Sequence, residues 1–272
     1  LGCAARGPCA LAGRGHAHHR RGRAGMSAPG SNLPEEPARP DPVRAILVFV
    51  AALFFVLSPL LSGGFGGFDP ALFPVPQDDP PVQPAGYAFA IWGLIYLWLI
   101  LSTGAGLFRR AGDAGWEATR APLLASLIPG AAWIGVALGS PLWASILLWW
   151  MAATAIWALM RAPRADRWLL QAPLAIYGGW LTAASFVSLG LLLAGYGFVG
   201  QTTAALIALA GALGVAAFVQ TRLARAPEYG ATLIWALIGI VVANVTAAPL
   251  VAVAAALGAG GMGALALRAA RG

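Results

Sequence analysis

Apolar stretches of about 20 residues recur along this chain from residue 43 onward, and they limit the possible fold more than any other feature. A helix that rises about 1.5 Å per residue needs roughly 20 residues to cross the hydrocarbon core of a bilayer. Of the 272 residues, 59% are hydrophobic and only 10% are charged, which lies outside the usual range of soluble domains. Because no alternation with a period of two is visible, we predict an all-α membrane protein, a polytopic helical bundle.

Eight stretches have the length and composition of transmembrane helices. Their expected boundaries are residues 43–62, 86–108, 121–139, 142–160, 169–191, 200–220, 230–245 and 248–267. The last two could instead form one long kinked helix, because Asn244, Thr246 and Pro249 lie at their junction. By these boundaries no charged residue lies at the centre of a span, which argues against an ion-driven pump.

Arginine positions favour eight spans over seven. Arginines gather in cytoplasmic loops, and here they precede the first span and follow the second, fourth, sixth and eighth. The intervening loops contain none, whereas seven spans would place Arg268 and Arg271 on the opposite side. We therefore expect both termini in the cytoplasm and a multi-pass protein of the cell (inner) membrane.

The first 42 residues are expected to form a disordered arm, because residues 27–42 are rich in proline and polar groups. Residues 1–25 precede the first methionine, lack the apolar core of a signal peptide and are interpreted as translated upstream sequence. Beyond them, twelve arginines and ten acidic residues leave a net charge of about +2, so no nucleic-acid partner is expected.

Both cysteines and all three histidines also lie within residues 1–25, at spacings that match no standard zinc site. The rest of the chain therefore has no thiol and no imidazole. This excludes Ser/His/Asp and Cys/His catalysis and haem ligation by histidine or cysteine. We expect no metal site, no cofactor and no catalytic residues.

The loop between the first two spans, residues 63–84, is long and has the sequence GGFGGFDPALFPVPQDDPPVQP. Its prolines stiffen it, and its three phenylalanines give it apolar groups to pack with. It is expected either to cover the end of the bundle as a lid or to be a solvated connector.

Aromatic residues form a second pattern. Helical periodicity places Phe89, Trp92 and Tyr96 on one stripe, and it aligns Tyr177 with Trp180. At about 1.5 Å per residue, four tryptophans lie roughly 9–16 Å from the same side of the membrane, each on a different helix. They are Trp92, Trp133, Trp150 and Trp180. Such a layer is consistent with core packing or with the flat walls of a pocket for a planar apolar ligand.

These residues resemble a known family. The stretch FAIWGLIY, Phe89 to Tyr96, is similar to the second helix of the translocator protein family TspO/MBR, also called tryptophan-rich sensory proteins. Trp133, Trp143 and the stretch APLAIYGGWLTAASF continue the resemblance in order over residues 43–191, and residues 192–272 look like the extension of its longer eight-helix branch.

The resemblance implies a five-helix bundle, often dimeric, that binds tetrapyrroles or sterol-like molecules in a pocket under the first loop. The ligand-binding residues that we expect from the pattern and the resemblance together are Phe89, Trp92, Tyr96, Trp133, Trp143, Trp150, Tyr177 and Trp180. Ala132 and Ser188 stand where the family usually has asparagine, and Gly135 replaces a second tryptophan, so the pocket has fewer polar groups.

We therefore expect a non-enzymatic membrane protein that senses or binds a planar hydrophobic ligand, with a porphyrin favoured. Two alternatives remain: a transporter of such a ligand, and an accessory subunit of a membrane complex that docks through its last three helices. Membrane lipid and a second copy of the chain are the other expected partners.

Overall fold

The computed structural model describes residues 42–271, which belong to one compact unit. The predictions made for residues 1–41, including the arm and its cysteines and histidines, lie outside the described residues. Eight α-helices form the described part of the chain, which contains no strand. They are α1 (Pro42–Ser62), α2 (Ile91–Phe108), α3 (Ala114–Ala137), α4 (Pro141–Arg161), α5 (Ala172–Gly195), α6 (Gln201–Arg222), α7 (Pro227–Asn244) and α8 (Pro249–Arg271).

The prediction of eight spans is confirmed. All eight helices are long and apolar enough to cross a membrane, when α2 and α5 are counted with the short helical turns that precede them. These turns are η2 (Gly86–Ala90) and η3 (Arg167–Gln171). The stretch around Pro249 is a break and not a kink, because α7 ends at Asn244 and α8 begins at Pro249, where the ring of proline suits the first turn of a helix.

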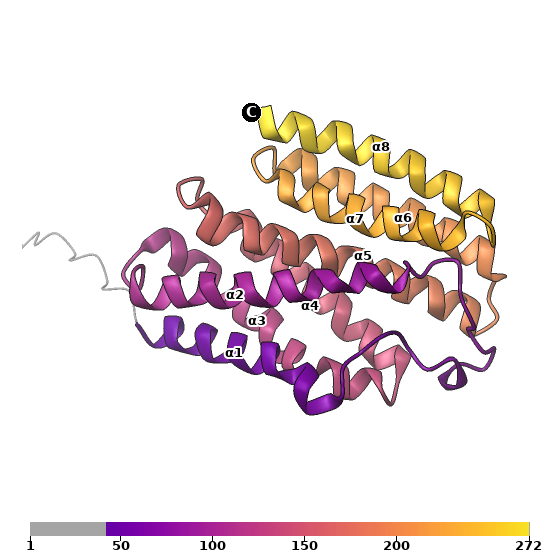
Figure 1. Ribbon diagram of the computed structural model, residues 1–272. Coiled ribbons are helices and arrows are strands. Elements are labelled where there is room, and N and C mark those ends of the chain that lie inside the picture. Colours follow the sequence, from indigo (N-terminus) through magenta and orange to yellow (C-terminus); the bar gives the residue numbers. More distant parts are fainter. Residues whose placement is uncertain (1–41, 272) are drawn as a thin grey trace, which may run out of the picture. The chain divides into compact units, whose positions relative to one another are not determined.

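The helices form a ring of five and a layer of three (Figure 1). Contacts between α1 and α2, α1 and α3, α3 and α4, α4 and α5, and α5 and α2 close the ring. On the other side of α5, α6 and α7 pack against it, and α8 covers both. Helix α5 is therefore enclosed by protein on two sides, and a larger share of it is buried than of any other described helix.

Helix α3 begins seven residues earlier than the apolar run predicted. The Asp113 side chain caps it by accepting hydrogen bonds from the amides of Gly115 and Trp116. This places Arg120, which was expected in a loop, within the helix and 4% exposed. Its guanidinium forms an ion pair with Glu117 and donates to the carbonyls of Arg110 and Ala111, which lie just beyond the end of α2, so the buried charge is compensated.

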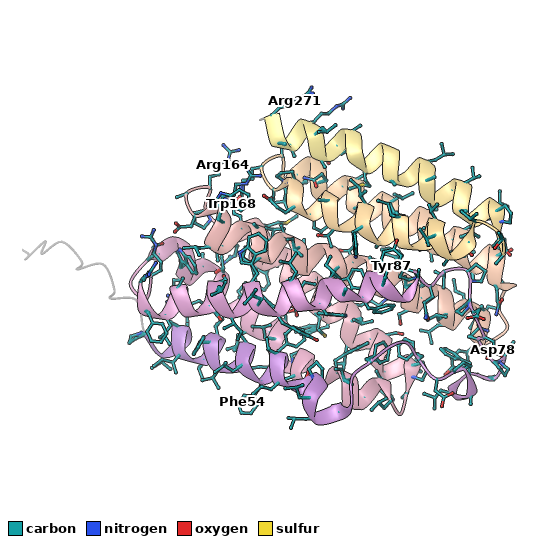
Figure 2. All side chains as sticks on the ribbon, in the orientation of Figure 1. Phe54, Asp78, Tyr87, Arg164, Trp168 and Arg271 are labelled. Atoms are coloured by element: carbon teal, nitrogen blue, oxygen red, sulfur yellow. The ribbon has the colours of Figure 1, made fainter. Side chains whose placement is uncertain are left out.

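The bundle has two chemically different ends. Figure 2 shows Arg164 and Trp168 at one end and Asp78, in the 63–84 loop, at the other. We call these the arginine end and the loop end. Phe54, on α1 between them, points away from the bundle and is 60% exposed, as expected for a side chain that faces lipid.

Helices α5 and α7 approach each other closely at one glycine. A Cβ atom added to Gly179 would lie 2.8 Å from the Tyr229 carbonyl oxygen and 3.0 Å from the Thr232 Cβ. One turn further along α5, the hydroxyls of Thr182 and Tyr229 are 3.0 Å apart and hydrogen-bonded. A small residue at position 179 is therefore a condition for this contact, as is common where membrane helices pack.

We predict that Gly179→Ala destabilises the bundle by about 1–3 kcal/mol, because the added methyl group must displace backbone atoms of α7. The neighbouring Gly178→Ala is the matched control, since its Cβ would make only ordinary contacts, at 3.7 Å or more. The control gains helix propensity, so it should be neutral or more stable by up to about 1 kcal/mol. Thermal unfolding of both variants in detergent measures the difference, and equal stabilities would contradict the close contact.

Candidate functional site

The 63–84 loop folds over the loop end of the ring and packs through its phenylalanines. The Phe65 ring lies edge-on to Trp133 of α3, with ring centroids 4.7 Å apart, and Phe68 contacts the same indole at 6.4 Å. Phe73 is buried against Gly195, and the Val75 amide donates to the Gly195 carbonyl oxygen at 2.8 Å. Through these contacts the loop covers the loop end of the ring.

Two adjoining cavities lie beneath this cover. One has a volume of about 190 Å³ and extends between α1, α2, α3 and α4, and the other has about 60 Å³ and extends towards α5 and α7. The wall between them is formed by residues that line both cavities. These shared residues are Phe65, Phe89, Trp92, Trp133 and Leu148.

Three of the four deep tryptophans meet at these cavities. Trp92 and Trp180 lie edge to face at 6.2 Å, and Phe89 contacts Trp180 at 5.9 Å. Tyr96 stacks on Trp92 at 5.2 Å with an angle of 22° between the rings, and it lines the larger cavity. Trp133 is fixed by a 2.9 Å hydrogen bond from its Nε1 to the Ala144 carbonyl oxygen.

The structure does not bring the other expected residues to the cavities. Trp143 is 62% exposed and Trp150 is 56% exposed on the outer face of α4. The inner face of this helix is formed by Leu148 and Met151, and residues seven apart share a single face, so Trp143 and Trp150 point outward together. Tyr177 is fully buried behind Phe55, with which it makes an edge contact at 5.7 Å.

Several lining residues were not expected from the sequence. Phe55 of α1 and Met151 of α4 line the larger cavity, and Ala236 of α7 lines the smaller one. Phe55 contacts Trp92, Tyr96 and Tyr177, so it could have been found only from its packing partners. Ala236 has no distinguishing signal in the sequence, yet it shows that α7, one of the last three helices, contributes directly to the site.

The indole N–H of Trp180 is buried and has no hydrogen-bond acceptor among the described residues. Such a donor costs about 1–3 kcal/mol when it is left unpaired in an apolar interior. The nitrogens of Trp133, Trp150 and Trp235 all donate to backbone carbonyls, whereas the buried nitrogen of Trp180, which lines the smaller cavity, does not. An acceptor on a bound molecule would remove this cost.

The cavity walls are apolar and carry no ionisable acid or base other than the Tyr96 hydroxyl. Their polar groups are the Ser58 hydroxyl, the Gln83 amide, the Tyr96 hydroxyl and the tryptophan nitrogens. Within residues 42–271 no group of histidine, cysteine or carboxylate side chains is arranged to hold a metal ion. The arrangement can therefore hold an apolar molecule, but it offers no pair of groups for acid–base chemistry.

Comparison with known proteins identifies one family. A family model described as TSPO-like protein matches residues 76–268, from within the 63–84 loop to the last turns of α8. The match includes all three helices of the C-terminal layer and does not include α1. No curated protein and no solved structure matches the chain.

We predict that Phe68→Ala loosens the 63–84 loop, because Phe68 joins Trp133 to Phe73, whose ring is 6.1 Å away. Hydrogen–deuterium exchange of the Val75 amide should become several-fold faster, since this amide is protected by the Gly195 carbonyl oxygen. Phe54→Ala removes a ring that faces outward and should leave the exchange unchanged. Unchanged exchange in Phe68→Ala would show that these ring contacts do not hold the loop.

Proposed function

The chain belongs to the TSPO-like protein family, and we propose that it is a membrane sensory or binding protein whose cavities hold a planar apolar ligand. A tetrapyrrole such as a porphyrin is the ligand class that we favour. The observation that carries this proposal is the meeting of Trp92, Trp133 and Trp180, from three different helices, at cavities with few polar groups. We place the protein in the cell inner membrane with its arginine end in the cytoplasm, in keeping with the distribution of arginines.

Flat rings on several sides favour a flat ligand. Tyr96 is stacked on Trp92 with 22° between the ring planes, while Trp180 stands edge-on to Trp92. A planar conjugated molecule can stack on a ring of this pair and meet Trp180 edge to face, as aromatic side chains prefer among themselves. A flexible aliphatic chain would gain less from such walls.

The cavities are smaller than the ligand that we propose. Their volumes, about 190 and 60 Å³, are below the roughly 300–1,000 Å³ of pockets for drug-sized molecules. The wall between them is formed in part by Phe65, which belongs to the 63–84 loop and not to a membrane helix. Displacement of Phe65 would join the two spaces, so binding is expected to require a shift of the loop.

The Trp180 nitrogen adds a requirement for polarity. A ligand with an oxygen or nitrogen acceptor at the smaller cavity would pair the free N–H of Trp180. Carboxylate and carbonyl oxygens on the rim of a tetrapyrrole meet this requirement. We do not propose catalysis, because the walls lack the paired acid and base that most enzymatic reactions use.

We predict saturable quenching of tryptophan fluorescence when the purified protein is titrated with protoporphyrin IX. Trp180→Phe keeps a ring but loses the N–H, so the affinity should fall about five- to tenfold, which corresponds to one hydrogen bond. Absorbance of the porphyrin serves as a second readout, because replacing a tryptophan also removes a fluorophore.

Trp143→Phe is the control for this titration, since Trp143 lies on the outer face of α4 and is 62% exposed. Its affinity should match that of the unmodified protein. An equal loss in both variants, or the absence of any saturable signal, would count against the cavities as the porphyrin site.

A further inference from the structure

Helix α7 holds the chain segment that leads from the 63–84 loop into α2. Three hydrogen bonds join them: the Ala85 amide donates to the Gly239 carbonyl oxygen at 3.0 Å, Asn244 Nδ2 donates to the Pro81 carbonyl oxygen at 2.9 Å, and Trp235 Nε1 donates to the Ala88 carbonyl oxygen at 2.9 Å. We call residues 81–88 the roof segment. The hydrogen bonds between the roof segment and α7 are thus spread over the whole length of the segment.

The contact is also close in its apolar part. A Cβ atom on Gly239 would lie 2.9 Å from the Pro84 Cβ and 3.0 Å from the Ala88 Cβ, so the segment lies directly on the α7 backbone. The Tyr87 ring meets Trp235 edge to face at 5.6 Å. Gly239 thus leaves room for the roof segment on α7, and Trp235 packs beside it.

Proline content makes these three bonds more important to the segment. Pro80, Pro81 and Pro84 have no amide hydrogen, so they cannot donate to a neighbouring strand or helix. Two of the eight residues of the roof segment therefore lack a donor, and the segment is held through its other amides and its carbonyl oxygens. Helix α7 pairs with one such donor, at Ala85, and with two of the carbonyls, at Pro81 and Ala88.

The roof segment in turn forms part of the cavity. Gln83 and Pro84 line the smaller cavity together with Ala236 of α7, and the chain continues directly into Phe89 and Trp92. Val82 is 3% exposed and packs against Gly190 of α5. A displacement of the segment from α7 would therefore open the cavity and also move Phe89 and Trp92, which form part of its aromatic wall.

We propose that α7 is a positioning element of the ligand site, and that Trp235, Gly239 and Asn244 are its positioning residues. They hold the roof segment closed over the smaller cavity, so that their loss opens the roof and weakens ligand binding while the bundle stays folded. The effect on affinity depends on the proposed function. The closed state of the roof does not, and it is tested without ligand.

The test uses a cysteine reporter at Val82, with Cys3 and Cys9 replaced by serine. A water-soluble maleimide should modify Val82→Cys slowly while the roof is closed, because this side chain is buried. Adding Trp235→Phe, which keeps an aromatic ring but removes the hydrogen bond to Ala88, should speed the modification about five- to tenfold.

Gly239→Ala should speed the modification of Val82→Cys as well, since its methyl group collides with Pro84 and Ala88. Gly261→Ala on α8 is the matched control, because a Cβ there has no atom within 4 Å and the same glycine is lost from a helix. The control should leave the rate unchanged.

A second reporter, Ala158→Cys, separates opening of the roof from loosening of the whole bundle. Ala158 is fully buried near the arginine-end terminus of α4. Faster modification at Val82→Cys alone supports the proposal. No change at Val82→Cys, or equal increases at both reporters, would overturn it, since α7 would then act only as general structural support.

Protoporphyrin titration of Trp235→Phe and Gly239→Ala completes the test and should show weaker binding than Gly261→Ala. If the two variants open the roof and yet bind as tightly as the control, the positioning role in binding is wrong. If the roof opens as expected but no variant and no unmodified protein binds porphyrin, the α7 contact stands and the proposed ligand is wrong.

Discussion

Helix α5 has protein on both sides, and the rest of the structure depends on this position. Adjacent residues of α5 serve the two sides: Gly179 gives α7 its close approach, and Trp180 lines the smaller cavity. Because the two residues share one backbone, the packing of the C-terminal layer and the wall of the site are linked. The roof segment adds a second link, since α7 holds it by hydrogen bonds to Pro81, Ala85 and Ala88.

Most of the fold was predictable because a membrane imposes simple constraints. The lengths of the apolar stretches and the alternation of arginines were sufficient for eight helices, and the boundary between α7 and α8 followed from charge and not from hydropathy. The start of α3 was not predictable in this way. Its first turns contain polar residues, so they do not belong to the apolar stretch from which the helix was predicted. Only the structure shows that Arg120 is buried against carbonyls near the end of α2.

The candidate site was predictable in part, because periodicity shows which residues share a helix face but not which face points inward. Phe89, Trp92 and Tyr96 were placed on one stripe and do line the cavities. Helical periodicity also places Trp143 and Trp150, seven residues apart, on one face of α4, but this face points outward. Residues contributed by distant segments, such as Phe55 and Ala236, have no local signal, since their role comes from tertiary packing.

Photoaffinity labelling tests the central claim most directly, because it locates the ligand without any substitution in the site. A porphyrin that carries a photoreactive diazirine would be bound to the protein, irradiated and mapped by mass spectrometry. Labels on the 63–84 loop, around Trp133 and around Ala236 are the predicted result, since these parts of the chain surround the cavities. Labels confined to the outer face of α4, at Trp143 and Trp150, would contradict the account.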